Sequence, residues 1–304
     1  MRKLVRGRIG AITVDEGQKK VVTVCGPTAA GKSDLSDDLA DRLSASWGER
    51  TPVVVVDSMQ VYSGIEKISN QARRRPAELV SVVPVTERWT VAWHARAALD
   101  LISASETGVV LDAGTGMYLN AILMRIPMAP EVPDSVRAQA LLASTGLTNP
   151  RRASRALELE LSGAPPRGCI WDGEPRYNTT LLYLRPEREA LDRRIAQRSA
   201  GIVAGSLKEA REIRTLQRDG HTINQSVIEA VGVREMLALV DDDITTDEAE
   251  EKISARTRRL ARRQLRWFDK LTRTLKAIDG TSVTVAQNSA DLWKLHTMHD
   301  TIIR

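Results

Sequence analysis

The sequence predicts an α/β fold in which a parallel sheet is flanked by helices and joined to a small helical insertion and a helical C-terminal part. In the first half of the chain, short apolar runs typical of buried strands alternate with stretches of helical periodicity, which indicates parallel strands with right-handed crossovers. The stretch 126–175 then holds seven of the chain's 12 prolines, so we expect an insertion there and not more sheet. Beyond it, helical periodicity dominates.

Strands and helices are expected to alternate in the core. Val21–Val24 is largely β-branched and meets a glycine loop, and Val53–Val56 is wholly apolar, as buried strands are. Helices are expected where apolar residues recur every three or four positions. In order, the expected elements are the strand 21–24, the helix 33–43, the strand 53–56, the helix 93–103 and the strand 109–111.

The second half of the chain is expected to be mostly helical. Short helices over 134–144 and 150–162 fit between the prolines, and 178–184 is predicted to return to the sheet as a strand. Further helices are expected over 187–200, 207–217, 226–240 and 246–276. We therefore divide the chain into an N-terminal extension (1–19), an α/β core (20–126), a short helical insertion (127–175) and a C-terminal part of the core (176–304).

Composition excludes several classes of protein. The chain has 304 residues, is 42% hydrophobic and 27% charged, and carries a net charge of +5, which permits a polyanionic partner without requiring one. Its two cysteines, Cys25 and Cys169, cannot form a disulfide framework, and no apolar run approaches the roughly 20 residues of a membrane span. Secreted disulfide scaffolds, integral membrane proteins and fibres are excluded. We expect a cytoplasmic protein without a secretory signal, and a monomer.

The segment Gly26–Ser33, GPTAAGKS, matches the pattern GxxxxGK[ST] between an expected strand and an expected helix. In such a phosphate-binding loop (P-loop), backbone N–H groups point at phosphate oxygens. Lys32 supplies a positive charge, and the Ser33 hydroxyl suits Mg²⁺. The alternative is a glycine turn without a ligand, which the correct flanks make weaker. The loop indicates a diphosphate or triphosphate and does not by itself name the reaction.

Two further polar segments are expected at the same edge of the sheet, where ligands of open α/β sheets bind. They are Asp57–Tyr62 (DSMQVY) and Gly114–Asn120 (GTGMYLN). Asp57 closes a strand that we expect beside the P-loop strand, so its carboxylate could serve Mg²⁺ or act as a general base. Each segment alone could be a capping aspartate or a tight glycine turn. Three such segments at one edge favour a binding site.

Four motifs, GPTAAGKS, DSMQVY, GTGMYLNAIL and TRRLARRQLRWF, together resemble the tRNA dimethylallyltransferase (IPP transferase) family. They occur in the family's order between Val21 and Lys270. The resemblance implies a prenyltransferase that moves a dimethylallyl group from dimethylallyl diphosphate to N6 of an adenosine next to the tRNA anticodon. It implies Mg²⁺ as the cofactor and tRNA, through its anticodon stem-loop, as the partner.

The resemblance also assigns roles to residues of the site. Asp57 would be the base, because an exocyclic amine shares its lone pair with the ring and needs a base as the new C–N bond forms. Thr115 would hydrogen-bond near the reacting groups, and Arg198 would bind diphosphate oxygens. Ser33 would hold Mg²⁺, with or without Asp57. The diphosphate would lie against Gly26, Pro27, Thr28, Ala29, Ala30, Gly31, Lys32 and Ser33.

Contacts with the adenosine or the tRNA are implied for Ser58, Gln60, Asn70, Arg258, Arg259, Arg262, Arg263 and Gln264. Gln60 is the candidate for reading the edge of a flipped adenine. The arginines belong to the stretch 251–276, which carries ten Lys/Arg against two acids. Apolar residues at near-helical spacing give this stretch a seam, so the basic residues face outward, where they can contact phosphates. A solvated charged face is the alternative.

Three departures from the family concern the acceptor. Pro76–Leu79 lacks the family's usual histidine pair, the insertion is short, and aromatic residues make up only 4% of the chain. Other functions therefore stay open. One is a prenyltransferase for a free adenine nucleotide or another small molecule, which the short insertion favours. Another is a P-loop kinase or ATPase, which leaves GTGMYLN and RRLARRQLRWF unexplained. The last is a catalytically silent RNA-binding descendant, which the intact P-loop and Asp57 oppose.

Overall fold

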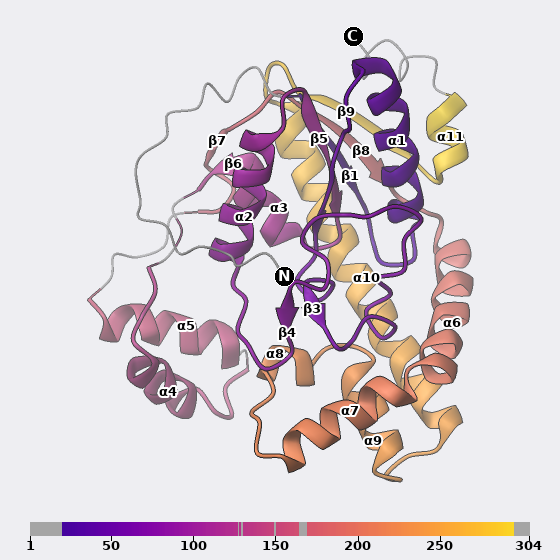
Figure 1. Cartoon of the computed structure of the whole chain (residues 1–304). Coiled ribbons are helices and arrows are strands. Elements are labelled where there is room, and N and C mark those ends of the chain that lie inside the picture. The colour runs from indigo at the N-terminus through magenta and orange to yellow at the C-terminus, as the bar shows by residue number, and fades with distance from the viewer. Residues whose placement is uncertain (1–19, 127, 129, 149, 164–168, 295–304) are drawn as a thin grey trace.

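The computed structural model describes residues 20–126, 128, 130–148, 150–163 and 169–294; the extension expected over 1–19 lies outside them. At its centre is a five-stranded sheet of order β2-β5-β1-β8-β9, in which all neighbours are parallel (Figure 1). The strands are β1 (Lys20–Cys25), β2 (Val53–Val56), β5 (Gly108–Ala113), β8 (Thr179–Leu184) and β9 (Ser282–Ala286). The predicted parallel α/β fold is confirmed, and β9 is a strand that we did not expect.

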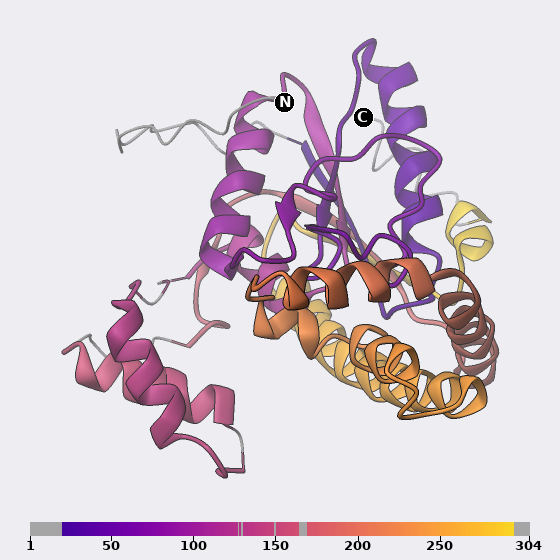
Figure 2. The same ribbon diagram turned by 60° about the horizontal axis from the view of Figure 1, so that its bottom comes forward.

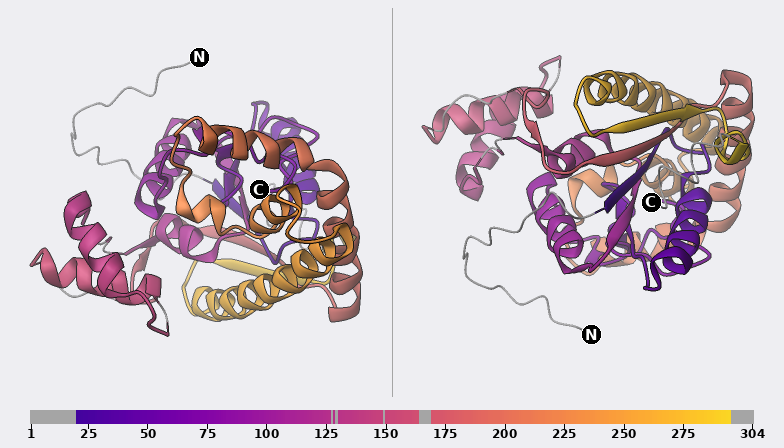
Figure 3. Two further views of the ribbon diagram at one scale, coloured as in Figure 1. Left: turned by 90° about the horizontal axis from the view of Figure 1, so that it is seen from below. Right: turned by 90° about the horizontal axis from the view of Figure 1, so that it is seen from above.

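Helices cover both faces of this sheet (Figure 3). They are α1 (Lys32–Trp47), α2 (Val91–Ala104), α3 (Gly116–Leu123), α10 (Thr246–Lys276) and α11 (Ser289–Lys294). Val21 and Leu111 face the core shared with α2, α3 and the end of α10, whereas Val22 and Val110 face the core shared with α1 and α11. Successive side chains of a strand point to opposite faces. β1 and β5 are therefore apolar on both sides, which explains their valine runs.

A second group of helices lies beyond the carboxyl ends of the strands (Figure 2). It comprises α6 (Arg188–Gly205), α7 (Leu207–Arg218), α8 (Gln225–Ile228), α9 (Val233–Val240) and the first half of α10. These helices form their own core around Ile213, Met236 and Ile253. The single helix expected over 226–240 is wrong, because Gly232 interrupts it at φ 95°. A Cβ at Gly232 would lie 2.7 Å from the Ile68 side chain, so the close packing there requires glycine.

The chain leaves the core through β6 (Met124–Arg125) and returns through β7 (Glu174–Pro175), which pair antiparallel. Between them lie α4 (Asp134–Ala143) and α5 (Pro150–Leu161), which pack on each other and stand to one side of the sheet in Figures 1 and 2. Both helices were expected, and β6 and β7 lie close to the boundaries that we propose for the insertion. A further short pair, β3 (Tyr62–Ser63) and β4 (Val83–Pro84), follows β2. In the described part of the chain, no helix combines the length and apolarity needed to cross a bilayer.

Candidate active site

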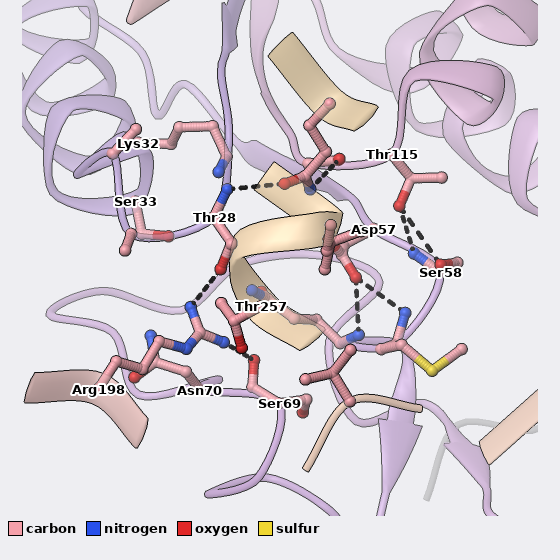
Figure 4. A pocket seen from close by; sticks show the side chains of 18 of the residues that line it. Thr28, Lys32, Ser33, Asp57, Ser58, Ser69, Asn70, Thr115, Arg198 and Thr257 are labelled. Carbon is pink, nitrogen blue, oxygen red and sulfur yellow. Dashed lines mark hydrogen bonds between the residues drawn. The ribbon is translucent and has the colours of Figure 1, made fainter. Parts of the chain in front are cut away.

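A cavity of about 1260 Å³ opens at the carboxyl edge of the sheet. The strand ends and the start of α1 line one side of it, and α6, α9 and α10 line the other. Figure 4 shows polar side chains from the loops after the strands and from α1, α6 and α10 converging on the cavity. This is the edge at which ligands of open α/β sheets bind, and it brings together segments that are far apart in the sequence.

The P-loop depends on two glycines. A Cβ at Gly26 would lie 2.5 Å from the carbonyl oxygen of Leu184, so the chain can leave β1 here only without a side chain. Gly31 adopts a left-handed conformation (φ 87°) immediately before α1. The first N–H groups of α1 are therefore free to bind an anion. Lys32 Nζ donates to the Pro27 carbonyl oxygen at 2.8 Å, which places the ammonium group over the loop.

Ser33 contacts a carboxylate that we did not single out from the sequence. Ser33 Oγ donates to Asp112 Oδ2 at 2.9 Å, and Arg73 Nη1 donates to the same oxygen at 2.5 Å. Arg73 also binds Asp37 at 2.7 Å. The charged side chains of this cluster are at most 5% exposed. Burial by itself lowers the pKa of Arg73, but Asp112 and Asp37 outweigh that effect and raise it.

Asp57 lies at a different position from the one expected. Its strand, β2, is separated from β1 by β5, so the expectation that Asp57 follows the neighbour of the P-loop strand is wrong. The strand between β2 and β1 is β5, which carries Asp112. Asp57 is held by its own loop instead, because Oδ1 accepts from the N–H groups of Met59 at 2.8 Å and Gln60 at 3.3 Å. Its other oxygen, Oδ2, lies toward Gly114, where a Cβ would come within 2.4 Å of it.

Thr115 joins the loop after β5 to the loop after β2. Its Oγ1 accepts from the Ser58 N–H at 3.0 Å and donates to Ser58 Oγ at 3.3 Å. The N–H groups of Gly114 and Thr115 both donate to the carbonyl oxygen of Val56 at 3.1 Å. The two polar segments predicted at this edge are therefore in direct contact, beside Asp57 (Figure 4).

Arg198 reaches the P-loop from α6. Its guanidinium donates to Thr28 Oγ1 at 2.9 Å and to the Ser69 carbonyl oxygen at 3.4 Å (Figure 4). Burial lowers the pKa of Arg198, and the charge of Asp57 opposes that decrease. Burial likewise lowers the pKa of Lys32, where Asp112 and Asp57 oppose the decrease and the charge of Arg198 adds to it. Two cations that repel each other in a half-buried site favour an anion between them.

Most of the predicted site residues line the cavity, namely Thr28, Ala29, Ala30, Gly31, Lys32, Ser33, Asp57, Ser58, Gln60, Asn70, Thr115, Arg198, Arg263 and Gln264. Gly26 and Pro27 are buried behind it. Arg258 is outside its lining and donates to Ser254 Oγ at 2.9 Å. Arg259 and Arg262 are exposed on α10, also outside the lining. The cavity is thus lined by most of the residues expected to bind the donor, by the expected base Asp57, and by only part of the expected RNA surface.

Sequence reasoning missed Asp112 and Arg73. Asp112 had a signal, because it closes its strand just as Asp57 closes β2, and only the strand order tells them apart. Arg73 had none, since it stands in a run of three arginines. The other two, Arg74 and Arg75, form ion pairs with Asp38 and Asp41 on the exposed side of α1. A charge run of that kind is ordinarily read as a solvated face.

Comparison with known proteins supplies relatives for this arrangement. A family model described as IPP transferase matches residues 60–147 and 140–271. The chain is 55% identical over 285 residues to a tRNA dimethylallyltransferase of Rubrobacter xylanophilus, covering 93% of this chain and 98% of the relative. It is 34% identical to a tRNA dimethylallyltransferase of Thermobifida fusca, covering 82% of this chain and 86% of that relative.

A solved structure resembles the whole fold. The crystal structure of a full-length tRNA isopentenylpyrophosphate transferase from Bacillus halodurans superposes with a TM-score of 0.65 at 25% sequence identity. The match covers 94% of this chain and 97% of that chain. The similarity thus extends beyond the P-loop core to the helices that close the cavity.

Proposed function

This chain belongs to the IPP transferase family, and from that membership we propose that it transfers a dimethylallyl group from dimethylallyl diphosphate to N6 of an adenosine next to the anticodon of tRNA. It is a prenyltransferase that modifies tRNA. We place the reaction in the cytoplasm, in keeping with two free cysteines among the described residues.

The observation that carries the proposal is that two carboxylates of the cavity, Asp112 and Asp57, have separate hydrogen-bond partners. Asp112 is engaged by Ser33 and Arg73, at the position where a P-loop enzyme keeps its metal-side acid. Asp57 is not needed there. It lies in the same cavity as the P-loop, held through one oxygen with the other turned toward Gly114. A kinase or ATPase that uses Asp57 for Mg²⁺ does not fit this arrangement, whereas a transferase with a separate base does.

The donor half of the mechanism is electrostatic. Lys32, Arg198 and the N-terminus of α1 hold the diphosphate, and they stabilise the negative charge that develops on it in the transition state. Both side chains line the cavity, and burial in it strengthens their interaction with an anion. The apolar side chains of Met59, Ile68 and Val231 line the same cavity and offer a surface for the dimethylallyl group.

The acceptor half requires removal of one proton. The N6 lone pair forms a bond to C1 of the dimethylallyl group while the bond from C1 to the diphosphate oxygen breaks, and that electron pair leaves with the diphosphate. The N6 proton passes to the Asp57 carboxylate. The N–H groups of Met59 and Gln60 fix that carboxylate, and the contact between Thr115 and Ser58 fixes its loop relative to β5.

The residues at the P-loop suit Mg²⁺. The Ser33 hydroxyl and the Asp112 carboxylate offer hard oxygen ligands, and Ser33 Oγ lies 2.9 Å from Asp112 Oδ2. Within the described ranges, no group of three or more His, Cys, Asp or Glu side chains could hold a metal alone. Mg²⁺ is commonly held by one or two protein groups together with substrate phosphates, and Ser33 would be the direct ligand here. When bound, the ion neutralises charge on the diphosphate.

The tRNA is proposed to lie against the exposed side of α10. Arg259, Arg262, Arg263 and Arg266 are exposed along this helix, and Arg263 also lines the cavity. Arginines that contact phosphates position an RNA and do not by themselves read its sequence. A basic face that runs from the surface to the mouth of the cavity can place the anticodon loop so that a flipped adenine enters.

The test of the function keeps the donor fixed and varies the acceptor. Radiolabelled dimethylallyl diphosphate and Mg²⁺ are incubated with the enzyme and, separately, with unmodified tRNA, an anticodon stem-loop, AMP, ADP or ATP. We expect label in the tRNA and in the stem-loop. The control is a stem-loop in which guanosine replaces the target adenosine, and it should stay unlabelled. Label in a free nucleotide and not in RNA would contradict the proposed acceptor, and label in no acceptor would contradict the proposed reaction.

A further inference from the structure

The side-chain amide of Gln264 bridges two loops of the site. Its Oε1 accepts from the Thr28 N–H of the P-loop at 2.9 Å. Its Nε2 donates to the carbonyl oxygen of Gly114, directly after β5, at 2.8 Å. These partners lie 236 and 150 residues away in the sequence. Gln264 was expected to contact the tRNA, but in the structure each end of its amide is already engaged by the protein backbone.

The two loops joined by Gln264 carry the two halves of the reaction. The P-loop carries Lys32 and Ser33, which face the donor. Gly114 precedes Thr115 and lies against Asp57, so its position sets the room available to the base. The Gly114 N–H is held by Val56 and its carbonyl oxygen by Gln264. The peptide unit before Gly114 is therefore tethered to β2. The unit after it is tethered to β2 through the Thr115 N–H and to α10 through the Gly114 carbonyl oxygen.

The helix that carries Gln264 is itself anchored to the same segment. Trp267 lies three residues further along α10, on the same face. Its indole N–H donates to Asn120 Oδ1 at 3.1 Å. A Cβ at Gly116 would lie 2.1 Å from the Trp267 ring, which shows how closely the ring packs on the start of α3. Asn120 is fully buried, so this second contact is made inside the protein. The part of α10 that carries Gln264 is thus held against α3 by Trp267.

We propose that Gln264 is a positioning residue, which sets the distance between the donor bound in the P-loop and the base beside Gly114. The inference rests on the proposed function, because it concerns the alignment of donor and base in that reaction. A small displacement of groups that must be aligned lowers the rate of the chemical step more than it lowers ground-state binding. Loss of the bridge is therefore expected to appear mainly in kcat.

The first test replaces Gln264 with methionine, which has a similar length and makes neither hydrogen bond. Single-turnover transfer to tRNA should slow about 10- to 100-fold, the range expected for a small misalignment. The Kd for inorganic pyrophosphate with Mg²⁺, measured by calorimetry, should change much less, because Lys32, Ser33 and Arg198 are untouched. Gln197→Met is the matched control, since Gln197 is an exposed glutamine on α6 and should leave both quantities unchanged.

A second variant separates the two hydrogen bonds. Gln264→Glu keeps an acceptor for the Thr28 N–H but sets a carboxylate oxygen against the Gly114 carbonyl oxygen. We expect this variant to transfer at least as slowly as Gln264→Met, because the bond to Gly114 aligns the base. It also provides a folded alternative if the methionine variant does not fold. Transfer by Gln264→Glu at the wild-type rate would overturn the assignment.

Other outcomes decide against the proposal in different ways. A Gln264→Met rate within about twofold of wild type, with a lowered melting temperature, would show a structural role only. Weaker tRNA binding with an unchanged single-turnover rate at saturating tRNA would make Gln264 an RNA contact. Hydrogen exchange tests the bridge without the reaction: the Thr28 amide should exchange faster in Gln264→Met, and unchanged exchange would overturn the bridge. A wild-type enzyme that prenylates no tRNA would contradict the proposed function and leave that exchange result standing.

Discussion

Gly114 leaves room for the carboxylate of Asp57, the proposed base, because it has no side chain. A Cβ at Gly114 would lie 2.4 Å from Asp57 Oδ2 and 3.9 Å from Lys32 Cε. The first distance is far below van der Waals contact, so an added methyl group must displace either the carboxylate or the loop. Since the N–H groups of Met59 and Gln60 hold Oδ1, the displacement will turn the carboxylate out of its present orientation.

Gly114→Ala is therefore expected to lower the single-turnover rate by about 100-fold, the effect of a misplacement near 1 Å. Pyrophosphate binding serves as the internal control and should stay near the wild-type value, because Gly114 is not part of the P-loop. Rapid-quench transfer and calorimetry measure the two quantities. A wild-type rate in Gly114→Ala would mean that the orientation of Asp57 seen here is not the one used in the reaction.

His94 is a buried histidine whose role is structural. Its ring is fully buried, and its two nitrogens bond to the Trp89 indole at 3.0 Å and to the Val55 carbonyl oxygen at 3.1 Å. An indole nitrogen can only donate, so Nδ1 accepts from it and Nε2 carries the proton that goes to Val55. Burial lowers the pKa of His94 to about 4. The folded protein thus keeps this ring neutral where an unfolded chain would protonate it.

The stability of the fold should therefore fall as the pH drops from about 6.5 toward 4. Over that window the unfolded state binds a proton that the folded state does not, and one pKa unit corresponds to about 1.4 kcal/mol, so His94 accounts for a loss of about 3 kcal/mol. Urea unfolding at pH 7 and pH 4 measures it. His94→Gln should show a smaller loss than wild type, whereas a change at the exposed His221 should not. If wild type and His94→Gln lost the same free energy of unfolding between pH 7 and pH 4, His94 would not be the source of the pH dependence.

At the scale of single elements, α10 runs from the exposed surface to the lining of the cavity. Its buried face, with Ile253, Phe268 and Leu271, joins two separate cores of the molecule. A capping box at Thr245 and Glu248 fixes where it begins. The arginines on its exposed side point away from these cores. Because the helix is 31 residues long, it spans from the helices beyond the sheet to the sheet itself.

Replacing Arg259, Arg262, Arg263 and Arg266 with alanine should weaken tRNA binding and flatten its salt dependence. Each lost phosphate contact lowers the slope of log K against log salt by about 0.7–0.9, so four contacts amount to about 3. Filter binding over a range of salt concentrations measures the slope. Arg42→Ala with Arg50→Ala is the control, because both residues are exposed and lie toward the end of α1 remote from the cavity. An unchanged slope in the α10 variant would mean that these arginines face solvent and do not contact the tRNA.

At the scale of the whole molecule, local pattern predicted the elements but not their order in space. Valine runs locate β1, β2 and β5, the apolar run LLYL locates β8, and the GxxxxGK[ST] spacing locates the P-loop. Burial on both faces and a phosphate turn each leave a short-range signal in the sequence. Strand order is a long-range property. It decides that β5 and not β2 lies beside β1, and hence that Asp112 and not Asp57 reaches Ser33.

Two further features of the structure depend on partners that are distant in the sequence. Gln264 stands in a basic helix and was assigned to RNA, whereas its bonds to Thr28 and Gly114 exist only once α10 is folded against the sheet. The strand β9 (SVTVA) alternates polar and apolar residues and is half-exposed, so it lacks the unbroken apolar run that marks the central strands. Each of these two features depends on contacts between segments more than a hundred residues apart in the sequence.

In the proposed reaction, one cavity holds the diphosphate donor, Asp112 lies on the side of the metal ion, and Asp57 is a separate base. The most direct measurement is single-turnover transfer of labelled dimethylallyl groups to tRNA by wild type and by Asp57→Asn, with the Kd values for pyrophosphate and tRNA measured on both proteins. We expect Asp57→Asn to lower the rate about 10²- to 10⁴-fold, the usual contribution of a general base, with both Kd values nearly unchanged. A near-wild-type rate, or a lost rate that merely follows lost pyrophosphate binding, would contradict it.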